Sequence, residues 1–149
     1  MDNQRLIKYL NQLLANTMIM KTKLLRYYWY GQDPEAEHLR RIFINNYHKF
    51  EDHMLNIGER ILVINGRPLA TLAKYLAEGT IEEAAAEQFL DEMIDQLAKD
   101  LAQMINDLEH EGLYLAKHLK DQQTYQLLSN ILQDLQQQQQ RINSYQNKY

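Results

Sequence analysis

The chain has 149 residues, of which 45% are hydrophobic, and a formal net charge of −4 at pH 7. This length predicts one domain, residues 1–149, with a sizeable buried core. The lack of cysteine excludes disulfides, thiolate metal sites and cysteine nucleophiles. The acidic balance argues against a generally basic surface that coats nucleic acid. No apolar leader and no run of about 18 apolar residues occurs, so we expect a cytoplasmic protein without a membrane partner.

Helix-compatible residues dominate the chain, which has only 5 glycines and 2 prolines. We therefore predict an all-α fold. Apolar residues spaced by three and four positions, with turn residues between the periodic stretches, predict five helices. Their expected bounds are about 3–30, 34–64, 68–78, 81–120 and 122–146.

The first two helices have clear end signals. Helix 3–30 ends in four aromatic residues, Tyr27 to Tyr30, followed by Gly31, the residue expected just past a helix C-terminus. We read these aromatics as packing or interface anchors, with a ligand-stacking or radical-relay cluster as the alternative. Asp33 and Pro34 are typical of an N-cap and a first helical position, so they predict the start of the second helix.

The later helices complete a bundle. Thr80 followed by Glu83 has the capping-box spacing and predicts the start of helix 81–120, with Gly112 as a weak point. Asp121 or Thr124 begins helix 122–146. Two long helices, a short cross-helix and two more long helices predict a ferritin-like four-helix bundle with one long crossover.

Metal ligands are the first thing to look for in such a bundle. The one Glu-x-x-His, Glu35 to His38, falls in the first turn of the second helix and is not repeated on a facing helix, so a conventional di-iron centre inside one subunit is not expected. His48, Asp52 and Glu59 lie on one stripe of the second helix, where His48 and Asp52 could share a divalent metal. The alternative is a polar stripe with a weak His–Asp pair. The other histidines, at positions 38, 53, 110 and 118, are expected to be solvated.

The stretch Lys23–Glu83 resembles the Dps family, the dodecameric mini-ferritins that protect DNA during starvation and oxidative stress. Its most specific feature is Glu-Arg-Ile followed by Gly-x-Pro-x-Ala-Thr and a short helix. The matching positions are Trp29, Tyr30, Leu39, Tyr47, Phe50, Glu59, Arg60, Ile61, Gly66, Pro68, Ala70, Thr71, Tyr75, Leu76, Glu82 and Glu83. The resemblance implies a homo-oligomer of twelve copies and oxidation of Fe(II) at a centre shared by two subunits.

This chain departs from the family pattern at most of the implied iron ligands. The two family histidines are replaced by Tyr28 and Arg40, and two acidic positions by Ile44 and Leu55; only Glu59 is retained. A guanidinium cannot ligate a cation, so we expect Arg40 to take the metal's place and to pair with Glu59 across the two-fold interface.

Two other family features are also weakened. The resemblance places Lys117, Gln122 and Gln126 where the family has acidic residues that line three-fold pores, and only the neighbouring Asp121 is acidic. The Lys/Arg-rich tail with which many relatives bind DNA is almost missing, so any DNA binding should be weak and non-specific.

Three readings of the function stay open. The first is a Dps-like stress-protection shell without the usual ferroxidase centre, with weak DNA binding and nucleoid association. The second is an active ferroxidase and iron store that uses His48, Asp52 and Glu59 as substitute ligands. The third is a structural or interaction bundle. Enzyme activity is left open, and the substitutions weigh against it. We expect no resident cofactor, with bound iron as the alternative.

Overall fold

The computed structural model describes residues 3–148. Every regular element in this range is helical, and none of these helices is long and apolar enough to cross a membrane. The helices are α1 (Gln4–Tyr30), η1 (Pro34–Ala36), α2 (Glu37–Val63), α3 (Leu72–Glu78), α4 (Leu90–Asp107), η2 (Leu108–Gly112), α5 (Leu113–His118) and α6 (Gln122–Asn143).

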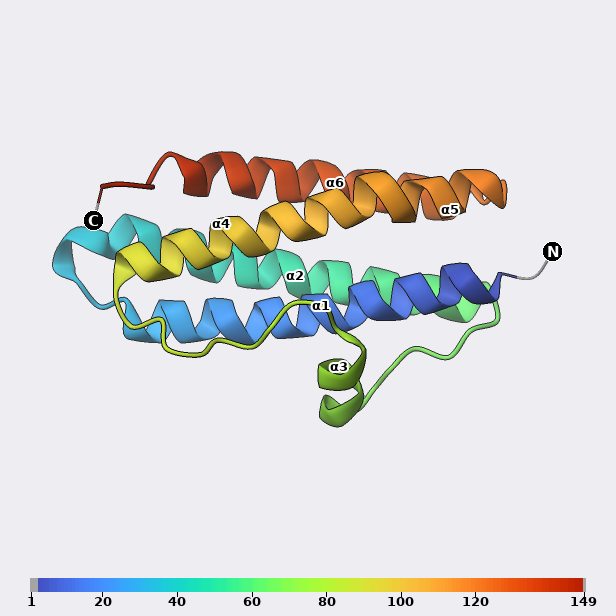
Figure 1. The fold of residues 1–149 in the computed structure, drawn as a ribbon, viewed down its shortest axis with the longest axis horizontal. Helices are drawn as coiled ribbons and strands as arrows, with labels where there is room; N and C mark the ends of the chain where they lie inside the picture. The colour runs from blue at the N-terminus through green and yellow to red at the C-terminus, as the bar shows by residue number, and fades with distance from the viewer. Residues whose placement is uncertain (1–2, 149) are drawn as a thin grey trace.

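The long helices form the predicted four-helix bundle. The antiparallel pair α1 and α2 packs against α4, α5 and α6, while the short helix α3 lies outside the bundle beside α1 (Figure 1). All four long segments supply the apolar core. Its fully buried members include Leu6, Leu10, Leu24, Phe43, Phe50, Ile61, Met93, Leu97, Leu101, Leu128 and Leu135. The all-α, ferritin-like fold with an extra helix in the crossover is thus confirmed.

Local sequence signals explain the turn between α1 and α2. The N–H of Gly31 bonds to the Tyr27 carbonyl and closes α1. The Asp33 side chain accepts the N–H of Glu35, and Pro34 opens a single 3-10 turn that leads into α2. The Asn3 side chain donates to the Ile64 carbonyl, so it fastens the start of α1 to the end of α2.

The crossover between α3 and α4 differs most from the prediction. Residues 79–89 are not helical, so the expected helix start at residue 81 with a Thr80–Glu83 capping box is wrong. The Asn16 amide oxygen accepts the N–H groups of both Thr80 and Ile81, so the Thr80 N–H that a capping box would pair with Glu83 is bonded to α1. Glu92 accepts the N–H of Phe89 and so caps α4 at its true start.

Other helix bounds shift by less. Helix α3 begins at Leu72 rather than at residue 68, because the Thr71 hydroxyl caps it by accepting the N–H of Lys74. Helix α6 ends at Asn143 rather than at residue 146, and the chain continues in turns.

The expected weak point at Gly112 is a widened, π-helical turn between α4 and α5. Gly112 is buried, and a Cβ placed on it would lie 2.7 Å from the Tyr9 ring. Gly112 therefore leaves the space in which the Tyr9 ring of α1 packs against this turn.

Candidate functional site

The residues at the two positions where the family resemblance implies histidine contact each other. Tyr28 lies near the end of α1 and Arg40 near the start of α2. The Arg40 guanidinium carbon is 4.4 Å from the centroid of the Tyr28 ring, and its Nε donates to the Tyr28 carbonyl at 2.9 Å. Nη1 lies 3.4 Å from a carboxylate oxygen of Glu37. A permanent positive charge is therefore held over the aromatic ring.

The remaining implied ligand positions lie further along the same helix. Ile44 is half-buried, while Leu55 and Glu59 are exposed. At 100° per residue, the four positions from Arg40 to Glu59 fall within about a third of the α2 circumference. Arg40 and Glu59 are separated by 19 positions of one helix, about 28 Å along its axis, so they do not meet within a chain.

The second candidate cluster is not assembled within the chain. His48 is exposed, and its Nδ1 lies 3.0 Å from a carboxylate oxygen of Glu51 rather than from Asp52. The bond from His48 lowers the pKa of Glu51. Asp52 and Glu59 are also exposed. Across residues 3–148, no three His, Asp or Glu side chains are grouped so that they could hold a metal ion.

His53 is not solvated as expected, because it pairs with Asp134 of α6. The distance between His53 Nε2 and Asp134 Oδ2 is 2.5 Å, and Lys49 and Gln138 also contact this carboxylate. Burial works against ionisation of Asp134, yet these partners, led by His53, hold its pKa below the usual range. The signal was in the sequence: position 53 lies three residues after Phe50 and four before Ile57, on the buried stripe of α2.

The residues at the implied pore positions surround the turn between α5 and α6. Lys117, Gln122 and Gln126 are exposed. Asp121 caps α6 through the N–H of Thr124 and is paired with Arg60 of α2 at 2.8 Å. Desolvation opposes ionisation of Asp121, but its bonds from Thr124 and Arg60 lower its pKa overall. The negative charge of Asp121 at this turn is thus already balanced by Arg60.

An ion pair inside the bundle was missed by the sequence analysis. Lys23 Nζ of α1 lies 2.6 Å from Asp100 Oδ2 of α4, and both side chains are almost fully buried. Lys23 also donates to the Glu82 carbonyl, and Gln96 donates to the other oxygen of Asp100. Burial, followed by the nearby Glu87 and Asp100 carboxylates, raises the pKa of the adjacent Tyr27.

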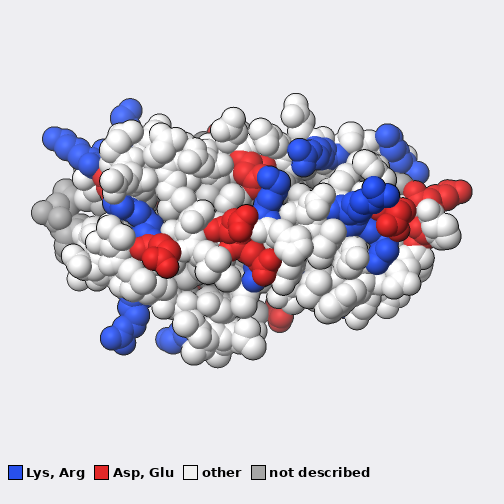
Figure 2. All heavy atoms as spheres, turned by 180° about the vertical axis from the view of Figure 1, so that it is seen from behind, with Lys and Arg blue, Asp and Glu red and all other residues white. Residues whose placement is uncertain are grey.

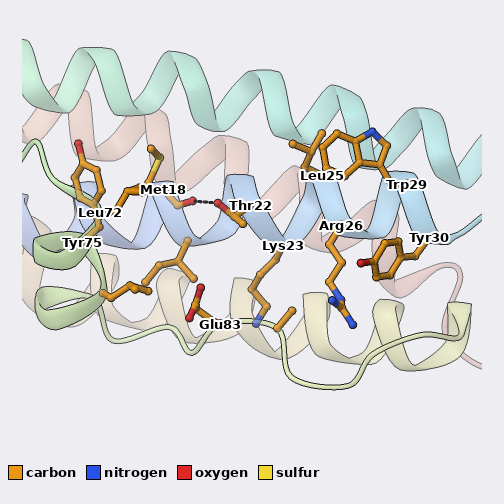
Figure 3. A pocket seen from close by; sticks show the side chains of 13 residues that line it. Met18, Thr22, Lys23, Leu25, Arg26, Trp29, Tyr30, Leu72, Tyr75 and Glu83 are labelled. Carbon is orange, nitrogen blue, oxygen red and sulfur yellow. Dashed lines mark hydrogen bonds between the residues drawn. The ribbon is translucent and has the colours of Figure 1, made fainter.

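An apolar groove of about 480 Å³ runs between α1 and α3. Trp29 and Leu72 in its wall are 56% and 70% exposed. Figure 3 shows Lys23 and Arg26 pointing from α1 toward the crossover, while Leu25 and Trp29 point to the other side. The aromatic run thus divides: Tyr27 packs in the core, while Trp29 and Tyr30 face outward.

Comparisons with known proteins place this bundle in a family. A ferritin-like domain family matches residues 7–149. The chain is 33% identical over 133 residues to DNA protection during starvation protein 2 of Bacillus anthracis, which covers 89% of this chain and 90% of the relative. It is 28% identical over 133 residues to general stress protein 20U of Bacillus subtilis, covering 89% and 91%.

Solved structures agree. The crystal structure of Dps from Staphylococcus aureus superimposes with a TM-score of 0.92 at 26% identity, covering 97% of this chain and 96% of that one. The Dps structure from Bacillus brevis gives 0.91 at 26% identity, covering 96% and 95%. The chain belongs to the Dps family of ferritin-like stress-protection proteins.

Proposed function

We propose that the protein is a shell-forming Dps whose inter-subunit iron-oxidising centre has been replaced by a structural cation, and which protects by assembly and weak, non-specific DNA binding. The observation that carries this proposal is the contact of Arg40 with Tyr28. These are the two positions at which the family resemblance implies histidine ligands. In place of two imidazoles that could bind Fe(II), the site has one fixed positive charge and one phenol.

The chemistry of these side chains is unfavourable for iron. A guanidinium has five N–H donors and no acceptor, and its charge repels an approaching Fe(II) ion. Ile44 and Leu55 offer no oxygen or nitrogen, so Glu59 is the one carboxylate among the implied ligands. Nε and Nη1 of Arg40 have partners within the described chain. We infer that Nη2 pairs with Glu59 of a second copy.

Assembly is supported by exposed apolar side chains. Trp29 and Leu72 of the groove, together with Leu55, Leu62 and Val63 of α2, are more than half exposed in the single chain. A second copy of the chain would remove this area from water, at roughly 25 cal/mol per Å². By family resemblance we expect the complete shell to contain twelve copies.

The test is Fe(II) oxidation by the purified oligomer, with oxygen and with peroxide, against buffer alone. We expect wild-type rates no faster than buffer. A variant carrying Tyr28→His, Arg40→His, Ile44→Asp and Leu55→Asp should gain a saturable rate at a fixed ratio of iron to subunit. It must first be shown to assemble to the wild-type size.

Saturable oxidation by the wild type would contradict the proposal. It would favour the alternative, an active iron-storage protein with substitute ligands. His48, Asp52 and Glu59 would then be replaced singly, with His38→Ala as the control.

A further inference from the structure

The crossover segment of residues 79–89, which we call the strap, has little apolar burial to hold it in place. It follows α1 from α3 to the start of α4, outside the four long helices (Figure 1). Ile81 is the one buried residue of the strap. The short helix α3 that precedes the strap buries none of its residues. Removal of apolar area from water therefore stabilises this part of the chain much less than the long helices.

Side chains, and not backbone ladders, hold the strap against the bundle. Within residues 3–148, no backbone group of residues 80–88 bonds to another backbone group. Instead, the Asn16 amide oxygen accepts the N–H groups of Thr80 and Ile81 at 2.8 and 3.1 Å, and its Nδ2 donates to the Thr80 hydroxyl. Asn16 of α1 therefore fastens the first residues of the strap with three hydrogen bonds.

Lys23 joins the strap to the ion pair inside the bundle. Its Nζ donates to the Glu82 carbonyl at 2.9 Å and lies 2.6 Å from Asp100 Oδ2. Arg26, three residues further along α1, lies 3.4 Å from the Glu87 carbonyl that it donates to. Opening of the strap would break these polar bonds, while the apolar core between the long helices would keep its contacts.

The strap also forms part of the apolar groove. Glu83 and Ala84 of the strap line the groove together with Leu72 and Tyr75 of α3, and Figure 3 shows how these elements face α1. From behind, the surface that α3 forms at the lower edge shows few charged side chains (Figure 2). A second copy seated in the groove would therefore contact α1, α3 and the strap together.

We propose that the strap is a latch that opens as a unit while the long helices stay folded, and that a second copy docked in the groove holds it closed. The second part rests on the proposed function, which supplies the second copy as the occupant. Segments with few buried apolar contacts open at a lower free energy than the whole domain. Because coupling between two equilibria is reciprocal, docking that favours the closed strap is itself favoured by a closed strap.

The test uses the absence of cysteine from the chain, which allows a single introduced thiol to report opening. Ile81→Cys places the thiol on the strap. Ile57→Cys is the matched probe in the core of α2, where Ile57 is also buried. The rate of reaction with an excess of a thiol reagent is measured on the assembled full-length protein.

Each probe is then combined with one of two matched changes on α1. Asn16→Ala removes the bonds that fasten the strap. Asn11→Ala removes the corresponding bonds before α3, where Asn11 contacts the backbone of Arg67 and Leu69. Size-exclusion chromatography and circular dichroism check that each variant is folded and assembled.

We expect the I81C thiol to react at least about tenfold faster than the I57C thiol. Asn16→Ala should raise the I81C rate by about tenfold and the I57C rate by less than about threefold, because it loosens the strap and not the core. Asn11→Ala should change the I81C rate by less than about threefold. Equal rates for the two probes, or equal effects of the two asparagine changes on I81C, would overturn the latch.

A last variant tests the link to docking. Leu72→Glu places a charge in the wall of the groove and should prevent assembly, and the I81C thiol should then react about tenfold faster than in the assembled protein. An unassembled L72E variant with an unchanged I81C rate would overturn the coupling, and one that still assembles would overturn the groove as the docking site. A chain without Leu72→Glu that stays monomeric would overturn the proposed shell and the coupling, whereas the comparison of I81C with I57C would still decide whether the latch exists.

Discussion

The buried pair of Lys23 and Asp100 gives the sharpest test of how the bundle is held together. Replacing Lys23 with Met keeps a similar length and removes the charge. Asp100 would then keep only the bond from Gln96, in a place where its side chain is 6% exposed. Leaving a carboxylate buried without its partner costs about 3–5 kcal/mol. That is a large part of the total stability of a domain of this kind.

The assay is urea unfolding followed by circular dichroism, at one fixed protein concentration because oligomers gain stability by mass action. Lys99→Met is the matched control, since Lys99 lies on the outer face of α4 beside Asp100. It should change the free energy of unfolding by no more than about 0.5 kcal/mol. K23M/D100L should recover most of the loss, because no unpaired charge remains. A K23M variant within about 1 kcal/mol of the wild type would refute the argument.

Two further changes test other contacts. Gly112→Ala should destabilise the protein by about 1–3 kcal/mol, because its Cβ would meet the buried Tyr9 ring at 2.7 Å. A Cβ placed on Gly58 of α2 would lie 4.0 Å from the Pro68 side chain, so Gly58→Ala should be neutral or stabilise the protein by up to about 1 kcal/mol. Thermal melting of both variants checks the sign of each change. The lowered pKa of Asp134 means that its stabilisation is present at neutral pH and lost as acidification protonates it in the folded state. Asp134→Asn should therefore cost about 1–3 kcal/mol near neutral pH and flatten the acid side of the stability profile in urea titrations at several pH values. The control Asp52→Asn, at an exposed position, should cost no more than about 0.5 kcal/mol near neutral pH.

The sequence was most informative where the controlling contacts are local. Asp33 and Pro34 set the entry to α2 through a cap that spans two residues. The spacing of apolar residues likewise predicted a helical bundle, because burial of one helix face follows from the chain's own periodicity. Tyr28 and Arg40 could also be named from the sequence as the residues at two implied ligand positions, since a motif fixes these positions by counting.

Interactions between segments that lie far apart in the chain could not be predicted from the sequence. The Thr80–Glu83 spacing favoured a helix start, but Asn16, 64 residues earlier, takes the N–H groups of that turn. A local capping signal is worth about 1 kcal/mol, so tertiary bonds readily override it. His53 was assigned to solvent because its chain neighbours are charged, while its partner Asp134 is 81 residues away.

The sequence by itself determined the helical bundle, its family resemblance and the residue types at the positions where that resemblance implies iron ligands, because these follow from periodicity and from residue identity at counted positions. The tertiary structure alone decided what the substituted residues do. It places the Arg40 guanidinium over the Tyr28 ring and pairs Lys23 with Asp100 inside the bundle. Charge and hydrogen bonding act through space, and only the folded chain brings these groups within a few ångströms of one another.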